Sequence, residues 1–204
     1  MAMTKSQLFT LIGANLPEND TGLITPAKLR EVNTQIVDSM LYAAAGVKEV
    51  ELLRAFSTTT QAPSAVDTAL QLTFGAAQGS ASDPVMLNAA GLVTFNVAGN
   101  YAVRVKLQCG HIGATGTSIM LSRILLSGTQ LGPTACVKLT QTDAITPTDS
   151  RVVVNVTTAQ TFVVQIMRDS TGSNFGGVYP QVATVASWGT APSALIVVSR
   201  LEPV

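Results

Sequence analysis

Charged side chains are scarce in this sequence. The 204 residues include 12 Lys and Arg and 12 Asp and Glu, so the formal net charge is zero and only 12% of residues are charged. An average soluble protein has roughly 25% charged residues. A neutral chain has no field to attract nucleic acid or an anionic membrane, so neither is expected as a partner. With 47% hydrophobic residues, the chain has few charges to cover a monomer's surface, which favours an oligomer.

Long apolar runs and signal sequences are also lacking. No stretch of about 18 consecutive apolar residues occurs, so insertion into a membrane as a helix is not expected. The first residues, Met-Ala-Met-Thr-Lys-Ser-Gln-Leu-Phe, lack a basic segment followed by an apolar one, so we expect no signal peptide. Aromatic residues make up 5% and do not alternate with basic ones, which is unlike a binding site for single-stranded nucleic acid.

Histidine and cysteine are too few for most catalytic or metal sites. His111 is the single histidine and lies in Cys109-Gly-His-Ile-Gly, at the end of a strand pattern. A Cys109–His111 pair would share a strand face, but no acidic residue is near in sequence, and a loop histidine is typically exposed. We therefore expect no enzyme activity, no cofactor and no metal; a sandwich hydrolase that depends on His111 is the competing hypothesis. Cys109 and Cys136 could pair, but both lie in apolar strand patterns and are predicted to be buried free thiols.

Acidic and glycine-rich loops give no ligand signature. Asp143, Asp149 and Asp169 lie in or beside loops, but their spacing is not that of an EF-hand, so turn capping is the simpler interpretation than calcium binding. The loop Gly113-Ala-Thr-Gly116 does not join a strand to a helix, and phosphate binding is therefore not indicated.

Strand patterns fill the chain from about residue 47 onward. In Tyr101–Gln108, apolar residues alternate with Ala102, Arg104, Lys106 and Gln108, which predicts a strand with one buried face. Many short strands without helical patterns between them predict an antiparallel β-sandwich. The predicted strands are 49–56, 68–74, 85–87, 92–97, 101–109, 118–127, 135–141, 151–156, 162–169, 181–188 and 194–201.

The N-terminal part has a different pattern. Thr25 can cap a helix, Pro26 suits its first position, and Gly46 ends it. One stripe of this predicted helix is apolar, so it needs a partner: its own domain, a neighbouring protein, or two further copies in a three-chain bundle. Residues 1–24 alternate apolar patches with turn formers. We predict an N-terminal arm and helix over 1–46 and a sandwich domain over 47–204.

Val93-Thr-Phe-Asn-Val-Ala-Gly-Asn-Tyr-Ala-Val-Arg-Val105 resembles the strand–turn–strand of the trimeric jelly-roll domains of the TNF and complement superfamily. Ile124–Leu131 looks like that family's outer hairpin, and Ala194–Leu201 looks like its last central strand. The chain departs from the family in its few aromatics and in Thr158–Thr161, where a Gly-Asp pair is expected. The resemblance implies a TNF-like jelly roll that forms a homotrimer. The residues expected at or near its interface are Tyr101, Val103, Val105, Ile196 and Val198.

Leu23-Ile-Thr-Pro-Ala-Lys-Leu-Arg-Glu-Val-Asn-Thr-Gln-Ile-Val-Asp-Ser-Met40 is similar to a segment near the start of tailed-bacteriophage structural proteins, such as fibres and other virion appendages. The likeness implies that the N-terminal part attaches to the particle and that the jelly roll points outward. The expected attachment residues are Leu8, Phe9, Leu11, Ile12, Leu29, Val32, Ile36 and Met40.

Together these patterns predict a structural component of a bacteriophage virion, made in the bacterial cytoplasm: a homotrimeric head-fibre, tail-fibre or decoration protein. Its partners would be copies of itself, other capsid, neck or tail proteins, and a host cell-surface glycan or protein. The loops expected to bind the host are 75–84, 143–150 and 170–177. The alternative is a free-standing lectin-like or cytokine-like trimeric binding module.

Overall fold

The computed structural model describes residues 47–203, except 113–114, 141–143, 174 and 186. The predicted N-terminal arm and helix lie outside these residues. Residues 50–200 form one compact unit. In the described part, no helix is long and apolar enough to cross a membrane. Its strands are β1 (Val47–Ser57), β2 (Leu70–Gln71), β3 (Val85–Leu87), β4 (Val93–Phe95), β5 (Gly99–Gly110), β6 (Ser118–Leu126), β7 (Thr129–Leu139), β8 (Ile145–Val156), β9 (Gln160–Arg168), β10 (Gly177–Val178) and β11 (Ala194–Pro203).

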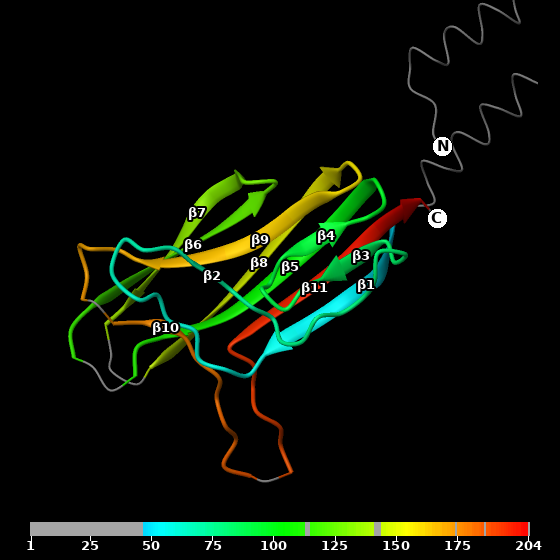
Figure 1. Ribbon diagram of the computed structural model, residues 1–204. Coiled ribbons are helices and arrows are strands. Elements are labelled where there is room, and N and C mark those ends of the chain that lie inside the picture. The colour runs from blue at the N-terminus through cyan, green and yellow to red at the C-terminus, as the bar shows by residue number, and fades with distance from the viewer. Residues whose placement is uncertain (1–46, 113–114, 141–143, 174, 186, 204) are drawn as a thin grey trace, which may run out of the picture. The chain divides into compact units, whose positions relative to one another are not determined.

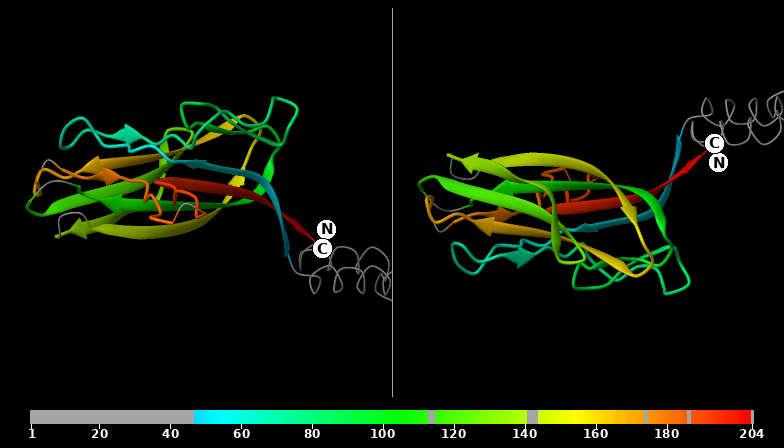
Figure 2. Two further views of the ribbon diagram at one scale, coloured as in Figure 1. Left: turned by 90° about the horizontal axis from the view of Figure 1, so that it is seen from below. Right: turned by 90° about the horizontal axis from the view of Figure 1, so that it is seen from above.

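The strands form two packed antiparallel sheets, as the predicted mainly-β sandwich requires (Figures 1 and 2). The first sheet has the order β1-β11-β5-β10, and β8 pairs with the other side of β5. The second sheet has the order β3-β4-β9-β6-β7, and β2 also pairs with β9. The chain changes sheet between β1 and β2, β4 and β5, β5 and β6, β7 and β8, β8 and β9, and β9 and β10. This interleaving is the topology of a jelly roll.

The turn before Tyr101 connects the two sheets. β4 pairs with β9 in the second sheet, whereas β5 pairs with β8 and β11 in the first. The turn begins at Asn96, earlier than the predicted Ala-Gly-Asn, because Gly99 and Asn100 already belong to β5. The Tyr101 hydroxyl donates to the Val97 carbonyl at 2.8 Å, and the Asn96 amide N–H donates to the Pro84 carbonyl at 2.8 Å. These bonds fix the crossing point.

The core lies between β5 and β11 on one side and β4 and β9 on the other. Tyr101, Val103, Ile196 and Val198 are all fully buried in the described chain. The Tyr101 ring packs against Phe95 with ring centroids 4.8 Å apart, in a tilted arrangement that aromatic pairs favour. Burying each such side chain contributes about 1.5–3 kcal/mol to folding.

Several local predictions were wrong. The predicted strand 68–74 is reduced to Leu70–Gln71, and 181–188 forms no strand beyond a single bridge between Gln181 and Ala191. Residues 145–150, predicted as a loop, form the first half of β8. They pair with β5 from Gly110 to Val105, and this long-range pairing overrides the turn preference of their Thr, Pro, Asp and Ser residues. Pro147 is tolerated because β8 lies at an edge of its sheet.

Candidate functional site

The five residues predicted for a trimer interface face the core of their own chain. Tyr101, Val103, Ile196 and Val198 are 0% exposed and Val105 is 3% exposed without any partner. They lie on β5 and β11, the paired inner strands of the first sheet, as expected. Side chains that are already enclosed cannot reach another copy, so any contact through this sheet uses the alternate residues. The strand was predicted correctly, but the residues that could reach a partner lie on its opposite face.

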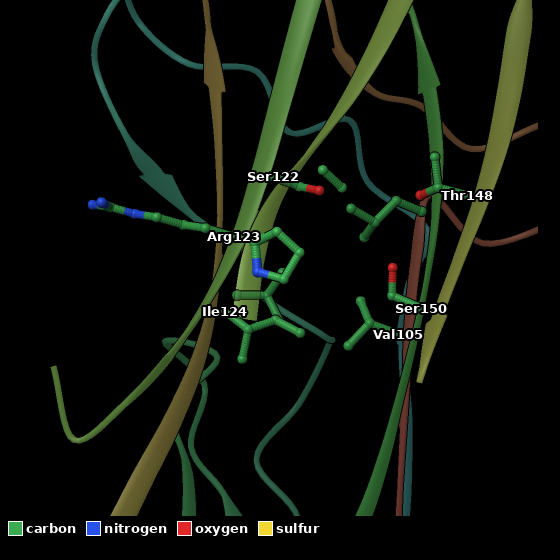
Figure 3. A pocket seen from close by; sticks show the side chains of 10 residues that line it. Val105, Ser122, Arg123, Ile124, Thr148 and Ser150 are labelled. Carbon is green, nitrogen blue, oxygen red and sulfur yellow. The ribbon is translucent and has the colours of Figure 1, made fainter. Parts of the chain in front are cut away.

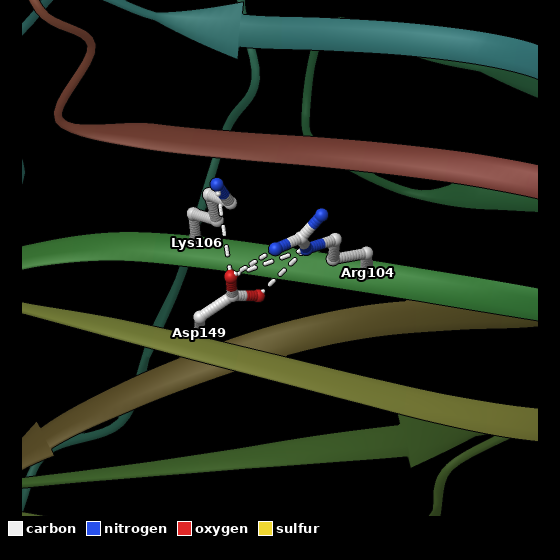
Figure 4. A network of polar contacts seen from close by, with 3 residues as sticks. All are labelled: Arg104, Lys106 and Asp149. Carbon is white, nitrogen blue, oxygen red and sulfur yellow. Dashed lines mark hydrogen bonds and ion pairs between the residues drawn. The ribbon is translucent and has the colours of Figure 1, made fainter.

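The outward face of the first sheet is flat and carries one ionic cluster (Figure 4). Arg104 Nε donates to Asp149 Oδ1 at 2.8 Å, and Lys106 Nζ lies 3.6 Å from Asp149 Oδ2. The hydrogen bond from Arg104 holds the pKa of Asp149 below its ordinary value. All three side chains are about half exposed, so the cluster contributes little to stability. The cluster holds two cations and one carboxylate, and exposed Arg151 lies opposite Arg104 in the register of β8 and β5, so this face is basic.

Apolar side chains surround the ionic cluster. Leu195 and Val197 lie opposite Lys106 and Arg104 in the register of β11 and β5, so they share the outward face. Val153 on β8 and Phe56 on β1 are 55% and 53% exposed. The face therefore exposes large apolar side chains between its charged residues.

A large hollow lies on the same face, beside the segment between β10 and β11. Its volume is about 800 Å³. Ile145, Pro147, Pro192 and Leu195 supply most of its apolar lining. The polar residues in its lining are Lys106, Gln108, Thr148, Asp149 and Gln181. A hollow of this size can accept a large side chain.

The sandwich is open on the side where β7 and β8 form the edges of their sheets. A pocket of about 40 Å³ leads into the core there, between Val105 and Val164 (Figure 3). Its lining includes the hydroxyl residues Ser122, Thr148 and Ser150. We call this region, with Pro133 and Ala135 of β7, the open side of the sandwich.

The pairing of β6 with β7 is irregular at the open side. Ser122 pairs with Ala135 and Ile124 pairs with Leu131, so Arg123 alone faces the three residues Gly132–Thr134. Most residues of β7 are exposed. The bulge turns the hairpin away from the core, because an extra residue bends a strand locally.

A second hollow lies on the outward face of the second sheet. Its volume is about 220 Å³, with Leu121 and Met167 as apolar lining and Asp67, Arg123 and Thr134 as polar lining. Arg123 Nε donates to Gln165 Oε1 at 2.9 Å, so the two side chains present one fixed polar pair.

The Cys109–His111 pair does not form an accessible nucleophile. His111 is 1% exposed, and neither ring nitrogen has a hydrogen-bond partner among the described residues, so the expectation of an exposed histidine was wrong. Burial raises the pKa of the Cys109 thiol to about 11, which suppresses the thiolate needed for nucleophilic attack. Both cysteines are free, but Cys136 is exposed rather than buried. The alternation around Cys136 did not indicate that β7 is an edge strand.

Two of the three predicted ligand loops are brought together, and the third lies apart from them. Ile145 and Gly177 both pair with Gly110 at the end of β5, whereas residues 75–84 are bound to Asn96, just before β5 begins. Asp149 is on a strand and Asp169 accepts the Thr171 backbone N–H at 2.8 Å, whereas Asp143 is outside the described residues. No group of three or more metal-ligating side chains occurs among the described residues. The predicted attachment residues, Leu8 to Met40, lie outside the described part.

The most exposed apolar segment was not predicted. Val182, Val185 and Trp188 are 67%, 56% and 75% exposed, and all three belong to the segment that was taken for a strand. The absence of any charged residue between Asp169 and Arg200 was the signal that could have drawn attention to it.

Comparisons with known proteins give a likeness of shape only. No protein-family model matches the sequence, and no curated protein is matched by it. Among solved structures, the globular domain of zebrafish complement 1qA protein is similar at 11% identity and a TM-score of 0.43, over 77% of this chain and 100% of that one. Murine APRIL at pH 5.0 is similar at 14% identity and a TM-score of 0.43, over 75% of this chain and 99% of that one.

Proposed function

We propose that this protein is a non-enzymatic structural component of a bacteriophage particle, a homotrimer that is attached through residues 1–46 and presents its jelly roll outward. The phage-like segment Leu23–Met40 supports the attachment. The outward face of the first sheet supports the self-association, and it is the observation that carries the proposal. Val153 and Phe56 are more than half exposed on this face, and contact with copies of the same chain best explains them.

In this arrangement, the open side of one copy packs on the outward face of the first sheet of the next copy. The open side offers Pro133 and Ala135, and the face offers Val153, Val197 and Phe56. When two different patches are in contact, repeated contacts form a closed ring if the rotation from one copy to the next divides a full circle. Three is the smallest number of copies above a dimer that forms such a ring. A stable contact needs about 800 Å² from each partner.

Mass measurement of the full chain tests the trimer. The expected result at micromolar concentration is an assembly of three chains. A stable monomer would contradict the argument from the low charge. Val153→Asp should weaken the assembly while circular dichroism stays unchanged. Thr129→Asp, at an exposed position on β7 away from the pocket of the open side, is the matched control.

Removal of residues 1–46 tests the attachment. The sandwich has its own core, so the shortened chain should fold, assemble as the full chain does and no longer join virions produced from phage lacking the wild-type copy. Incorporation of the shortened chain at wild-type occupancy would place the attachment elsewhere. The free-standing binding module would gain support if the full chain also failed to join particles.

The hollow beside Arg123 and Gln165 supports an additional adhesive role toward a host-surface saccharide. A sugar ring has an apolar face and neighbouring hydroxyl groups, which match Leu121 and Met167 beside the fixed Arg123–Gln165 pair. Arg123→Ala should reduce binding of the assembled protein to host cells at least tenfold, whereas Gln78→Ala, at an exposed position beside β3 on the opposite edge of the same sheet, should not. Equal binding of both variants would remove this role and leave the structural one.

A further inference from the structure

A long segment between β10 and β11 projects away from both sheets (Figure 1, orange to red). Its base is held in place. Gln181 and Ala191 exchange backbone hydrogen bonds at 3.0 and 2.8 Å, and the Ser193 hydroxyl donates to the Thr59 carbonyl at 2.7 Å. The segment is therefore an anchored projection with a defined direction.

The end of this projection is apolar. Val182, Val185 and Trp188 are each more than half exposed, and Trp188 is the only tryptophan in the chain. The Trp188 backbone N–H donates to the Val185 carbonyl at 3.0 Å, so one turn brings these two residues together. We call residues 182–185 and 187–188 the Trp188 knob. Exposed apolar clusters of this kind mark contact sites.

The hollow of about 800 Å³ on the outward face of the first sheet has the matching chemistry. Ile145, Pro147 and Leu195 give it apolar walls. Lys106 can lie against an indole face as a cation–π partner, and the Asp149 carboxylate can accept from an indole N–H. The knob points away from the sheets of its own chain, so its own hollow stays unfilled.

We propose that the Trp188 knob of one copy occupies the hollow of the next copy. This inference rests on the proposed self-association and adds the residues that lock it. Knob and hollow are different patches on every copy, so each copy gives one knob and receives one, which leaves none unpaired in a closed ring. The charge-free run from 170 to 199 suits such an occupant, because the knob itself brings no charge that has to lose its water.

Tryptophan fluorescence of the full chain tests this directly, because Trp188 is the sole emitter of its kind. When the protein is diluted from an assembled to a dissociated state, verified by mass, the emission should shift to longer wavelength and acrylamide quenching should increase severalfold. Equal quenching in both states would overturn the knob contact while leaving the assembly intact. A chain that stays monomeric at all concentrations would overturn both proposals.

Variants give a second test. Trp188→Ala should raise the concentration for half-dissociation at least tenfold, Trp188→Phe should retain most of the affinity, and Phe175→Ala, at another exposed aromatic, should change nothing. Leu195→Ala should weaken assembly as well, and combining it with Trp188→Ala should add little, because both remove one contact. If the effects of the two substitutions on assembly were fully additive, the two residues would not share a contact and the proposal would be refuted. Loss of host-cell or virion binding with unchanged assembly would also refute it, because the knob would then bind a different partner.

Discussion

The two long sides of the sandwich are built from similar strands but are closed to different degrees. Between β5–β11 and β4–β9, every inward side chain from Tyr101 to Val105 meets aromatic or branched partners and is buried. On the open side, β7 bends away, and the inward positions are Ser122, Thr148, Ser150 and the exposed Ala135. The contrast teaches that alternation of apolar residues is not enough to close a sandwich, since the facing strand must also lie within packing distance. One side holds the chain together, and the other is available for contacts.

The largest expected effect on stability comes from placing a charge on the packed side of the sandwich, and the open side should tolerate the same change. Val103→Asp should reduce the free energy of unfolding by more than about 4 kcal/mol, because it places an unpaired carboxylate in the packed side. Ala135→Asp, at an inward but exposed position of the open side, should change the free energy of unfolding of the dissociated chain by less than about 1 kcal/mol. Urea unfolding and soluble yield measure both. Similar losses for the two variants would show that the open side is closed in solution.

The reactivity of the two cysteine thiols gives a second comparison of the two sides. Cys136 on β7 should react with a disulfide reagent such as DTNB in the folded protein, and Cys109 should react only after unfolding. The thiol pKa of Cys109, which burial raises to about 11 from an ordinary 9.0, lowers its thiolate fraction about a hundredfold near neutral pH. The enclosed position of the sulfur also keeps the reagent away. Two fast-reacting thiols per folded chain would contradict the burial of β5.

The same raised pKa gives a pH dependence. Because the folded state holds the Cys109 proton more tightly than the unfolded state, its contribution to stability is complete below pH 9 and is lost as the pH rises toward 11. Cys109→Ala should flatten the loss of stability in that window, measured by thermal unfolding. If the stability of the variant falls with pH as steeply as that of the wild type, other groups cause the loss of stability.

A smaller effect is expected at His111. Both of its ring nitrogens are buried without partners in the described chain, so the imidazole adds a desolvation cost and no compensating bond. His111→Leu should leave the free energy of unfolding unchanged or raise it by about 1–2 kcal/mol. A loss above about 2 kcal/mol would reveal a polar role. His111→Ala is the control, because it leaves a cavity in addition to removing the ring.

The smallest effect concerns the ionic cluster on the outward face. The pKa of Asp149 is lowered by Arg104, so its contribution exists above the unfolded pKa of about 3.9 and is lost as the pH falls through the lower folded value. Asp149→Asn should therefore match the wild type in acid and be slightly less stable at pH 7, as thermal unfolding can show. A variant that is less stable only below pH 3 would reverse the assignment.

The sequence predicted the central strands well because their pattern is local. Tyr101, Val103 and Val105 alternate with polar residues, and that alternation alone defines the buried face. It could not tell that the core of the same chain, rather than another copy, covers this face. The first half of β8 was missed because its residues prefer turns and become a strand only by pairing with Arg104–Gly110. The surfaces proposed for contact depend on the bend of β7 and the anchoring of residues 181–193, which no local pattern encodes.

The bulge in β7 has a consequence for how the molecule can grow. Pro133 has no N–H to offer, and Gly132–Thr134 are out of step with Arg123, so this border cannot template another strand along its length. Lys138 adds a charge near the other end of the same border. Copies are thereby hindered from extending the second sheet through β7.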